Sequence, residues 1–251
     1  MKRSVIMALL MAVAVGLVFA GGESEEPGVT KITVGTDATW PPMEFVNEDR
    51  EIVGFDIDLM EAIAREAGFE VEFQNTAWDG IFAGLGAREY DAVISSVTIT
   101  EERKETMDFS EPYINAGQVL IVGSDQSGVT TLADLEGESV GAQIGTTGAF
   151  EVEKVDGVEL RTYDELGLAI EDLANGRIAG VVADTPIAAD YVLQNDNYRD
   201  RLQIVGEPFT EEFYGVAVRK GNDEVLALIN EGLAAVIESG EIEELKDKWL
   251  R

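Results

Sequence analysis

From residue 31 onward, short mainly apolar runs alternate with longer stretches in which apolar residues recur every three or four positions. The runs are typical of buried strands, and the stretches are typical of amphipathic helices. We predict strands at 31–36, 70–73, 90–95, 118–122, 139–143, 159–163, 179–183, 202–205 and 214–218. We predict helices at 56–67, 79–87, 100–107, 165–174, 186–194, 224–239 and 242–249, with shorter helical segments at 132–135 and after 148. This alternation indicates mainly parallel sheets with helices on their faces.

One helix illustrates the end signals. The helix predicted at 56–67 has Asp56 as its expected N-cap and Gly68 just past its last residue. Residues 85–95 and 173–184 repeat one pattern: a helix end, a turn with Gly or Ala and Arg, and an apolar strand. The repeat favours two lobes of similar build, and a cleft between lobes is a preferred ligand site.

The first residues have the pattern of an export signal. Lys2 and Arg3 are followed by an uncharged, mostly apolar run at 5–20, shorter than the roughly 20 residues that span a membrane. We predict a signal peptide at 1–20, cleaved after Ala20, and a flexible acidic leader at 21–28. An N-terminal anchor helix is the alternative. The prediction places the protein in the periplasm or on the extracellular side of the inner membrane.

Composition excludes several classes of chemistry. The chain has 251 residues, 49 of them acidic and 18 basic, with a formal net charge of −31 and neither histidine nor cysteine. A Ser-His-Asp triad, a disulfide and a cysteine-based zinc site are therefore excluded. The acidic excess argues against a nucleic-acid partner, which needs clustered Lys and Arg. Yet 45% of the residues are hydrophobic, too many for a disordered acidic tail.

Polar residues follow four of the predicted strands, where open α/β sheets bind ligands. Thr98, Thr146 and Thr147, with nearby backbone N–H groups and Arg103, could hold a carboxylate. A second group offers carboxylates and flat aromatic faces to a cation: Asp184, Asp37, Trp40 and Trp78. Together these groups predict a site for an amino-acid zwitterion.

Each of these residues also has a purely structural interpretation. Asp184 could cap the following helix, Arg103 could be a solvated helix residue, and Trp78 could belong to the core. The pair Asp56 and Asp58 has the spacing of a metal-binding Asp-x-Asp motif, but acids in a first helical turn favour the helix dipole and are the preferred explanation.

A set of ordered segments resembles one known family. They are ITVGTDATWPPMEF at 32–45, VGFDIDL at 53–59, WDGI at 78–81, DAVISSVTITEER at 91–103, DFSEPY at 108–113, GTTG at 145–148, Asp184, YGVAV at 214–218, SGE at 239–241 and KW at 248–249. This set, which covers residues 30–251 in the family's order, resembles the polar amino-acid-binding proteins of ABC importers.

The resemblance implies a fold and an architecture. We expect the α/β two-lobed periplasmic-binding-protein fold (type II), in which each lobe is a mainly parallel sheet flanked by helices and two hinge strands join the lobes. The first lobe would be discontinuous, at 29–115 and 212–251, with the second at 120–207 and the hinge segments at 116–119 and 208–211. The resemblance further implies a monomer without catalytic residues, cofactor or metal, whose lobes close on an L-amino acid and whose closed form docks on a membrane permease.

The resemblance also assigns the binding residues. Arg103 with Thr98 and Thr147 would hold the α-carboxylate of the ligand, and Asp184 with Ser96 would hold its α-ammonium group. The side chain of the ligand would face Asp37, Trp40, Trp78 and Gln143. Ser95 and Thr146 would contribute through backbone groups or at the rim.

The residues indicate the identity of the bound amino acid less clearly than they indicate the class of ligand. Asp37 and two tryptophans suit a cationic side chain, and Gln143 suits a guanidinium or an amide. Arginine is therefore favoured, with glutamine as the alternative and lysine or ornithine next. Two other functions stay open: a ligand-sensing domain, and an enzyme like the cyclohexadienyl dehydratases, which resemble this fold. Glu44 is a conceivable acid for such an enzyme, but Asp184 would repel the second carboxylate of its substrate.

Overall fold

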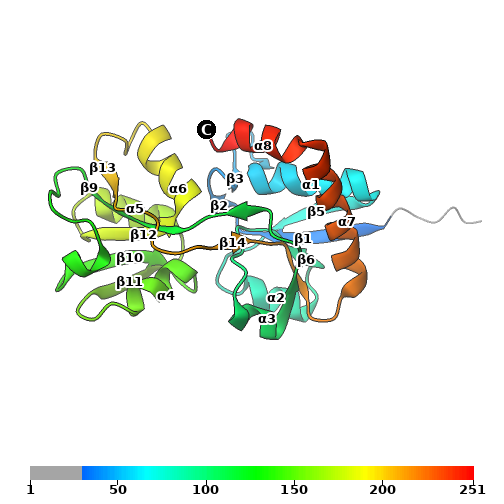
Figure 1. Cartoon of the computed structure of the whole chain (residues 1–251), viewed down its shortest axis with the longest axis horizontal. Coiled ribbons are helices and arrows are strands. Elements are labelled where there is room, and N and C mark those ends of the chain that lie inside the picture. Colours follow the sequence, from blue (N-terminus) through cyan, green and yellow to red (C-terminus); the bar gives the residue numbers. More distant parts are fainter. Residues whose placement is uncertain (1–29) are drawn as a thin grey trace, which may run out of the picture.

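The computed structural model describes residues 30–251 as two lobes side by side, each built around a five-stranded sheet (Figure 1). The predicted signal peptide and leader, at 1–20 and 21–28, lie outside the described residues. Within 30–251, no helix combines the length and apolar character that crossing a bilayer requires.

The first sheet contains strands from both ends of the described chain. Its order is β5 (Glu70–Asn75), β1 (Lys31–Thr36), β6 (Ala92–Val93), β15 (Ala217–Arg219) and β7 (Met107–Phe109). β1 pairs in parallel with β5 and β6, whereas β15 is antiparallel to both β6 and β7. Four strands therefore run in one direction and β15 runs in the other.

The second sheet repeats this arrangement. Its order is β11 (Glu159–Tyr163), β10 (Ser139–Gln143), β12 (Gly180–Asp184), β9 (Gln118–Gly123) and β13 (Leu202–Val205). β10 is parallel to β11 and β12, and β9 is antiparallel to β12 and β13. In each lobe the reversed strand is the first one after the chain arrives from the other lobe. The predicted fold of two mainly parallel sheets is confirmed.

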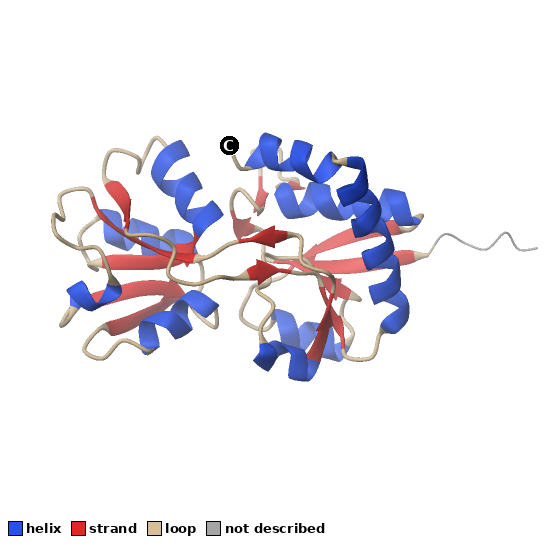
Figure 2. Ribbon diagram, in the orientation of Figure 1, coloured by secondary structure: helices blue, strands red, loops and turns tan. Residues whose placement is uncertain are grey.

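Helices cover both faces of each sheet (Figure 2). The first lobe has α1 (Phe55–Ala67), α2 (Ile81–Ala87), α3 (Glu101–Thr106), α7 (Asp223–Ser239) and α8 (Glu241–Trp249). The second has α4 (Thr147–Glu153), α5 (Leu166–Ala174) and α6 (Thr185–Ala189), with a 3-10 turn at Leu132–Leu135 and a π turn at Asp190–Gln194. A small sheet of β2 (Thr39–Trp40), β3 (Glu44–Val46) and β4 (Ile52–Val53) was not predicted.

Two extended segments cross between the lobes next to each other. β8 (Ile114–Asn115) and β14 (Phe213–Tyr214) pair antiparallel beside the crossing. A Cβ atom on Gly117 would lie 2.3 Å from the carbonyl oxygen of Thr210, so the close approach of the two segments requires glycine there. The Gln118 N–H donates to the Thr210 hydroxyl at 2.8 Å and fixes their register.

The predicted cap of α1 is wrong. The helix begins at Phe55, its N-cap is Gly54 with φ of 139°, and the Asp56 side chain is fully buried. A Cβ on Gly54 would lie 2.1 Å from the Met43 carbonyl oxygen, which explains why glycine starts the helix. Asp56 accepts hydrogen bonds from elsewhere in the lobe instead of capping its own helix. Gly68 does end the helix in the left-handed conformation, as predicted.

Candidate functional site

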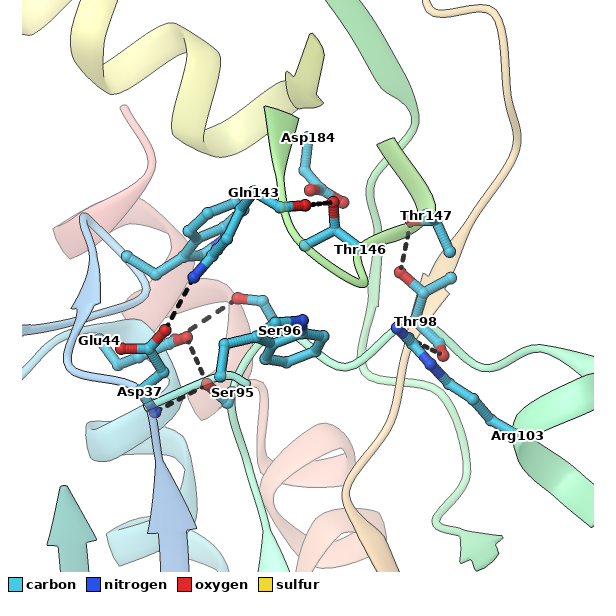
Figure 3. Close-up of a pocket in the computed structure, with 12 residues that line it drawn as sticks. Asp37, Glu44, Ser95, Ser96, Thr98, Arg103, Gln143, Thr146, Thr147 and Asp184 are labelled. Atoms are coloured by element: carbon cyan, nitrogen blue, oxygen red, sulfur yellow. Dashed lines mark hydrogen bonds between the residues drawn. The ribbon is translucent and has the colours of Figure 1, made fainter. Parts of the chain in front are cut away.

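A cavity lies between the two lobes, with about 320 Å³ of space not filled by atoms, part of it open to solvent (Figure 3). All eleven residues singled out from the sequence line this cavity. They are Asp37, Trp40, Trp78, Ser95, Ser96, Thr98, Arg103, Gln143, Thr146, Thr147 and Asp184. Glu44 lines it as well.

The sheet topology explains why these side chains meet. Asp37 follows β1, Ser95 follows β6, Gln143 ends β10 and Asp184 ends β12. β1 and β6 are parallel in the first sheet and β10 and β12 in the second, and both pairs point their carboxyl ends toward the space between the lobes, where α/β sheets bind ligands. Each lobe therefore supplies one wall of the same cavity.

Arg103 lies at one end of the cavity. Its Nη1 donates to the carbonyl oxygen of Thr98 at 2.8 Å, and its Nη2 donates to that of Gly145, across the cleft, at 3.4 Å. The guanidinium carbon lies 5.4 Å from the centre of the Trp78 ring and 5.1 Å from that of Phe82. Burial lowers the pKa of Arg103, and the charges of Asp184 and Glu212 oppose that shift. Arg103 is therefore a partly desolvated cation whose position is fixed by hydrogen bonds to both lobes.

Glu212, which the sequence analysis did not select, joins the two lobes at this end. Its Oε2 accepts hydrogen bonds from the hydroxyls of Thr98 at 2.9 Å and Thr147 at 2.7 Å. Thr98 belongs to the first lobe and Thr147 starts α4 in the second. Each threonine hydroxyl has one proton, and it donates that proton to Glu212. Its lone pairs can therefore only accept further hydrogen bonds.

Asp184 is buried at the end of β12 and faces the cavity (Figure 3). It occupies the N-cap position of α6, but its side chain makes no capping hydrogen bond. Its Oδ1 accepts from Gln118 Nε2 at 3.0 Å. Burial, followed by the charge of Glu212, raises the pKa of Asp184 to about 7. A cation beside this carboxyl would stabilise its ionised form.

The other end of the cavity holds two acids from the first lobe. Asp37 accepts from the Thr39 hydroxyl at 2.9 Å and from Gln143 Nε2, in the second lobe, at 3.0 Å. Burial raises the pKa of Asp37. The Ser95 hydroxyl accepts from the Asp37 N–H and donates to Glu44 Oε1, both at 3.0 Å.

Two tryptophans complete the walls: Trp40 is 7% exposed and Trp78 is 9% exposed. Thr146 caps α4 by accepting from the Ala149 N–H, and its hydroxyl donates to the Gln143 carbonyl oxygen at 2.8 Å. Thr146 therefore shapes the turn that carries Thr147. The cavity has a cation at one end, acids at the other, and aromatic side chains between them.

The Asp-x-Asp spacing in α1 does not form a metal site. Asp56 points into the first lobe, whereas Asp58 accepts from Lys248 Nζ at 2.6 Å and from Trp249 Nε1 at 2.7 Å. Among residues 30–251, no group of three or more acidic, histidine or cysteine side chains is arranged to hold a metal ion.

The family model of the bacterial extracellular solute-binding proteins, family 3, matches residues 32–251. The chain belongs to this family. The resemblance read from the motifs is therefore confirmed. The L-cystine-binding protein TcyJ of Escherichia coli (strain K12) is 36% identical over 222 residues, 87% of this chain and 82% of the relative.

Two further relatives bear on the ligand. The ABC transporter arginine-binding protein 1 of Escherichia coli (strain K12) is 36% identical over 255 residues, covering 99% of each chain. The solved structure of an ancestral arginine-binding protein bound to arginine is 43% identical, with a TM-score of 0.83 over 88% of this chain and 98% of that one. The relatives are thus amino-acid-binding proteins whose named ligands differ.

Proposed function

We propose that this solute-binding protein captures a polar L-amino acid, best arginine, between its lobes and delivers it to the permease of an ABC transporter. It would do so as a monomer in the periplasm, closing about crossing segments at 116–119 and 208–211. The observation that carries the choice of arginine is the end of the cavity opposite Arg103, where Asp37 and Glu44 lie among aromatic side chains. This end suits a delocalised, planar cation.

The α-groups of the ligand would bind nearer the crossing segments. Arg103 and the N–H groups at the start of α4 would receive the α-carboxylate, since both are positive. Asp184 would receive the α-ammonium group, together with Ser96. The role that we expected for Thr98 at the α-carboxylate changes, because its hydroxyl donates to Glu212 and can offer only lone pairs, which would face the α-ammonium group. The α-carboxylate, the α-ammonium group and the side-chain cation of the ligand would thus each lie beside a group of opposite charge.

The named relatives bind different amino acids, so a direct screen is the test. We would measure thermal unfolding with each of the twenty amino acids, ornithine and citrulline. A ligand present at a hundredfold its Kd should stabilise the protein by roughly 2.7 kcal/mol. Arginine should give the largest shift. A larger shift with glutamine would reassign the ligand, and a screen without any shift would remove the proposal.

One observation favours a second candidate. Glu44 lines the cavity and is fully buried, and its pKa is raised well above its usual range by burial and by the charge of Asp56. A protonated carboxyl of this kind could serve as a general acid on a cyclohexadienyl substrate. Asp184 and Glu212 would repel the second carboxylate of such a substrate. Chromatography of prephenate and arogenate incubated with the protein would detect turnover, which we do not expect.

A further inference from the structure

Two carboxyl groups from different elements meet beneath the acidic end of the cavity. Glu44 lies in β3 and Asp56 in the first turn of α1, and both residues are 0% exposed. Ser96 connects them: its N–H donates to Asp56 Oδ2 at 2.7 Å and its hydroxyl donates to Glu44 Oε2 at 3.4 Å. Ser96 has a φ of 50°, in the left-handed region that is uncommon for residues other than glycine. This conformation lets one residue reach both acids.

The hydrogen bonds around the pair leave one oxygen unsatisfied. Asp56 Oδ2 also accepts from the Tyr113 hydroxyl at 2.9 Å, but Asp56 Oδ1 is buried with no donor among the described residues. Ser96 holds Glu44 and Asp56 beside each other, because its N–H and its hydroxyl each donate to one of the two carboxyls. A proton held between them would satisfy Oδ1, which would otherwise be a costly buried acceptor.

No positive charge neutralises the pair. The titratable groups that face it are Asp37 after β1, Tyr113 before β8, and Tyr214 in β14. All three are neutral or negative, and no basic side chain within residues 30–251 forms an ion pair with Glu44 or Asp56. Two adjacent buried carboxylates without a cation repel each other, so one proton is retained.

The directions of the pKa shifts of the two carboxyls agree with this geometry. Burial and the neighbouring Asp56 raise the pKa of Glu44 well above its usual range, and burial raises that of Asp56 to about 7. The two groups titrate as a pair rather than separately. Near neutral pH the pair therefore holds a proton that it can lose when a cation arrives.

We propose that the Glu44–Asp56 pair shares a proton in the ligand-free protein and releases it to solvent when a cationic ligand side chain binds against Glu44. This inference rests on the proposed function, that is, on a cationic ligand. In the step, the O–H bond of the carboxyl breaks, the proton passes to the buffer, and the pair gains one negative charge that the ligand cation offsets. By linkage, the affinity for the cationic ligand rises more steeply with pH than the affinity for a ligand of similar shape whose side chain is neutral.

Calorimetry in two buffers of different ionisation enthalpy, phosphate and Tris, measures the released proton directly. Citrulline, which has nearly the same shape and an uncharged side chain, measures the protons released by the α-groups of the ligand, including any that Asp184 loses beside the α-ammonium group. At pH 7, arginine should release about half to one proton more per molecule bound than citrulline does, because the side-chain cation favours the ionised pair. Equal proton release by arginine and citrulline would overturn the proposal.

Two variants locate the source of the proton. Glu44→Gln keeps a group that can donate to Asp56 Oδ1, so we expect it to fold, to release no more protons with arginine than with citrulline, and to lose the difference in pH dependence between the two ligands. Asp37→Asn removes a neighbouring carboxylate and is the matched control: it should weaken arginine binding but still release the proton. Loss of proton release in Asp37→Asn alone would transfer the role to Asp37.

An infrared measurement keeps the test independent of affinity. The band of a protonated carboxyl should be stronger in the ligand-free wild type than in Glu44→Gln, where Asp184 still contributes to it, and should weaken in the wild type when arginine binds. If arginine gives no heat in either buffer, the proposed ligand is wrong, and the difference between the ligand-free wild type and Glu44→Gln still decides whether the pair holds the proton. Identical bands in the two proteins would overturn the shared proton itself.

Discussion

Gln143 and Asp37 are joined across the cleft by a hydrogen bond of 3.0 Å, from Nε2 to Oδ2, although 106 positions separate them in the sequence. Gln143 Nε2 also donates to the Asp164 carbonyl oxygen at 2.9 Å. Both amide protons are thus engaged on known acceptors, and the amide oxygen of Gln143 stays an acceptor. A carboxylate and an amide oxygen from opposite lobes therefore converge at the acidic end of the cavity.

This convergence predicts a ligand-selective effect of Asp37→Ala. A guanidinium would lose its ionised partner, so arginine binding should weaken by about 2 kcal/mol or more, roughly thirtyfold. Glutamine, whose amide carries no charge, should lose less than about tenfold. Calorimetry with both ligands checks this difference. Equal losses for arginine and glutamine would rule out the cationic assignment.

Glu212 should affect ligands in a different way. Replacing it with glutamine removes an oxygen that two threonine hydroxyls share, so their protons would turn toward the cavity. Because these threonines would contact the α-groups, we expect Glu212→Gln to weaken all bound amino acids by about 1 to 2 kcal/mol, regardless of side chain.

Glu211→Gln is the matched control for this change. Glu211 precedes Glu212 and is exposed, so the variant removes the same charge from the crossing segment without touching the threonines. It should bind as the wild type does in the same titrations. Equal weakening by both variants would show that Glu212 acts only through its charge at long range.

The positions of the cavity residues could be predicted because a general rule connects them. Asp37, Ser95, Gln143 and Asp184 follow apolar strands that the pattern identifies, and parallel strands end at one edge. The family resemblance then added Gln143 to the candidate residues and assigned each residue a role. What the pattern could not give is the reversed direction of β9 and β15, since an apolar run has no direction.

Glu44 and Glu212 were left out of the predicted binding set for separate physical reasons. Glu44 lies in a three-residue strand, too short for an alternating pattern, and was considered only as the acid of an enzyme. Glu212 follows Glu211 and resembles one half of an exposed acidic pair, yet the crossing segment buries it to 8% exposure. Asp56 was predicted to be the N-cap of α1. Gly54 takes that position instead, so Asp56 lies in the first turn of the helix and its side chain is buried.

The buried acids predict that the ligand-free protein is more stable at mildly acidic pH than at alkaline pH. Burial raises the pKa of both Asp56 and Asp184 to about 7. Between roughly pH 4 and pH 7 the folded protein therefore holds protons that the unfolded chain releases. The free energy of unfolding should fall as pH rises through this window and should stay low above it.

Thermal unfolding at constant ionic strength from about pH 5 to pH 8 measures this dependence. Asp184→Asn should flatten part of the slope, because it removes one of the groups with a raised pKa. Asp200→Asn removes the same charge from an exposed position and should keep the wild-type slope. Identical slopes in the wild type and Asp184→Asn would mean that Asp184 does not carry the effect.

The last prediction concerns the packing of α7 on α1, which holds the C-terminal part of the chain to the first lobe. A Cβ on Gly232 of α7 would lie 2.3 Å from the Ile63 carbonyl oxygen in α1, and a backbone atom cannot yield as a side chain can. Gly232→Ala should therefore destabilise the protein by about 1 to 3 kcal/mol. Gly86→Ala in α2 is the matched helical control, because nothing beyond its chain neighbours and the backbone of its own helix lies within 4 Å of the added Cβ. This control should be neutral or stabilising by up to about 1 kcal/mol, since alanine favours helices.

Denaturant unfolding of both variants measures the difference. Ligand affinity should be unchanged in either, because both glycines lie outside the cavity lining, and a stable Gly232→Ala would show that the two helices can separate at little cost.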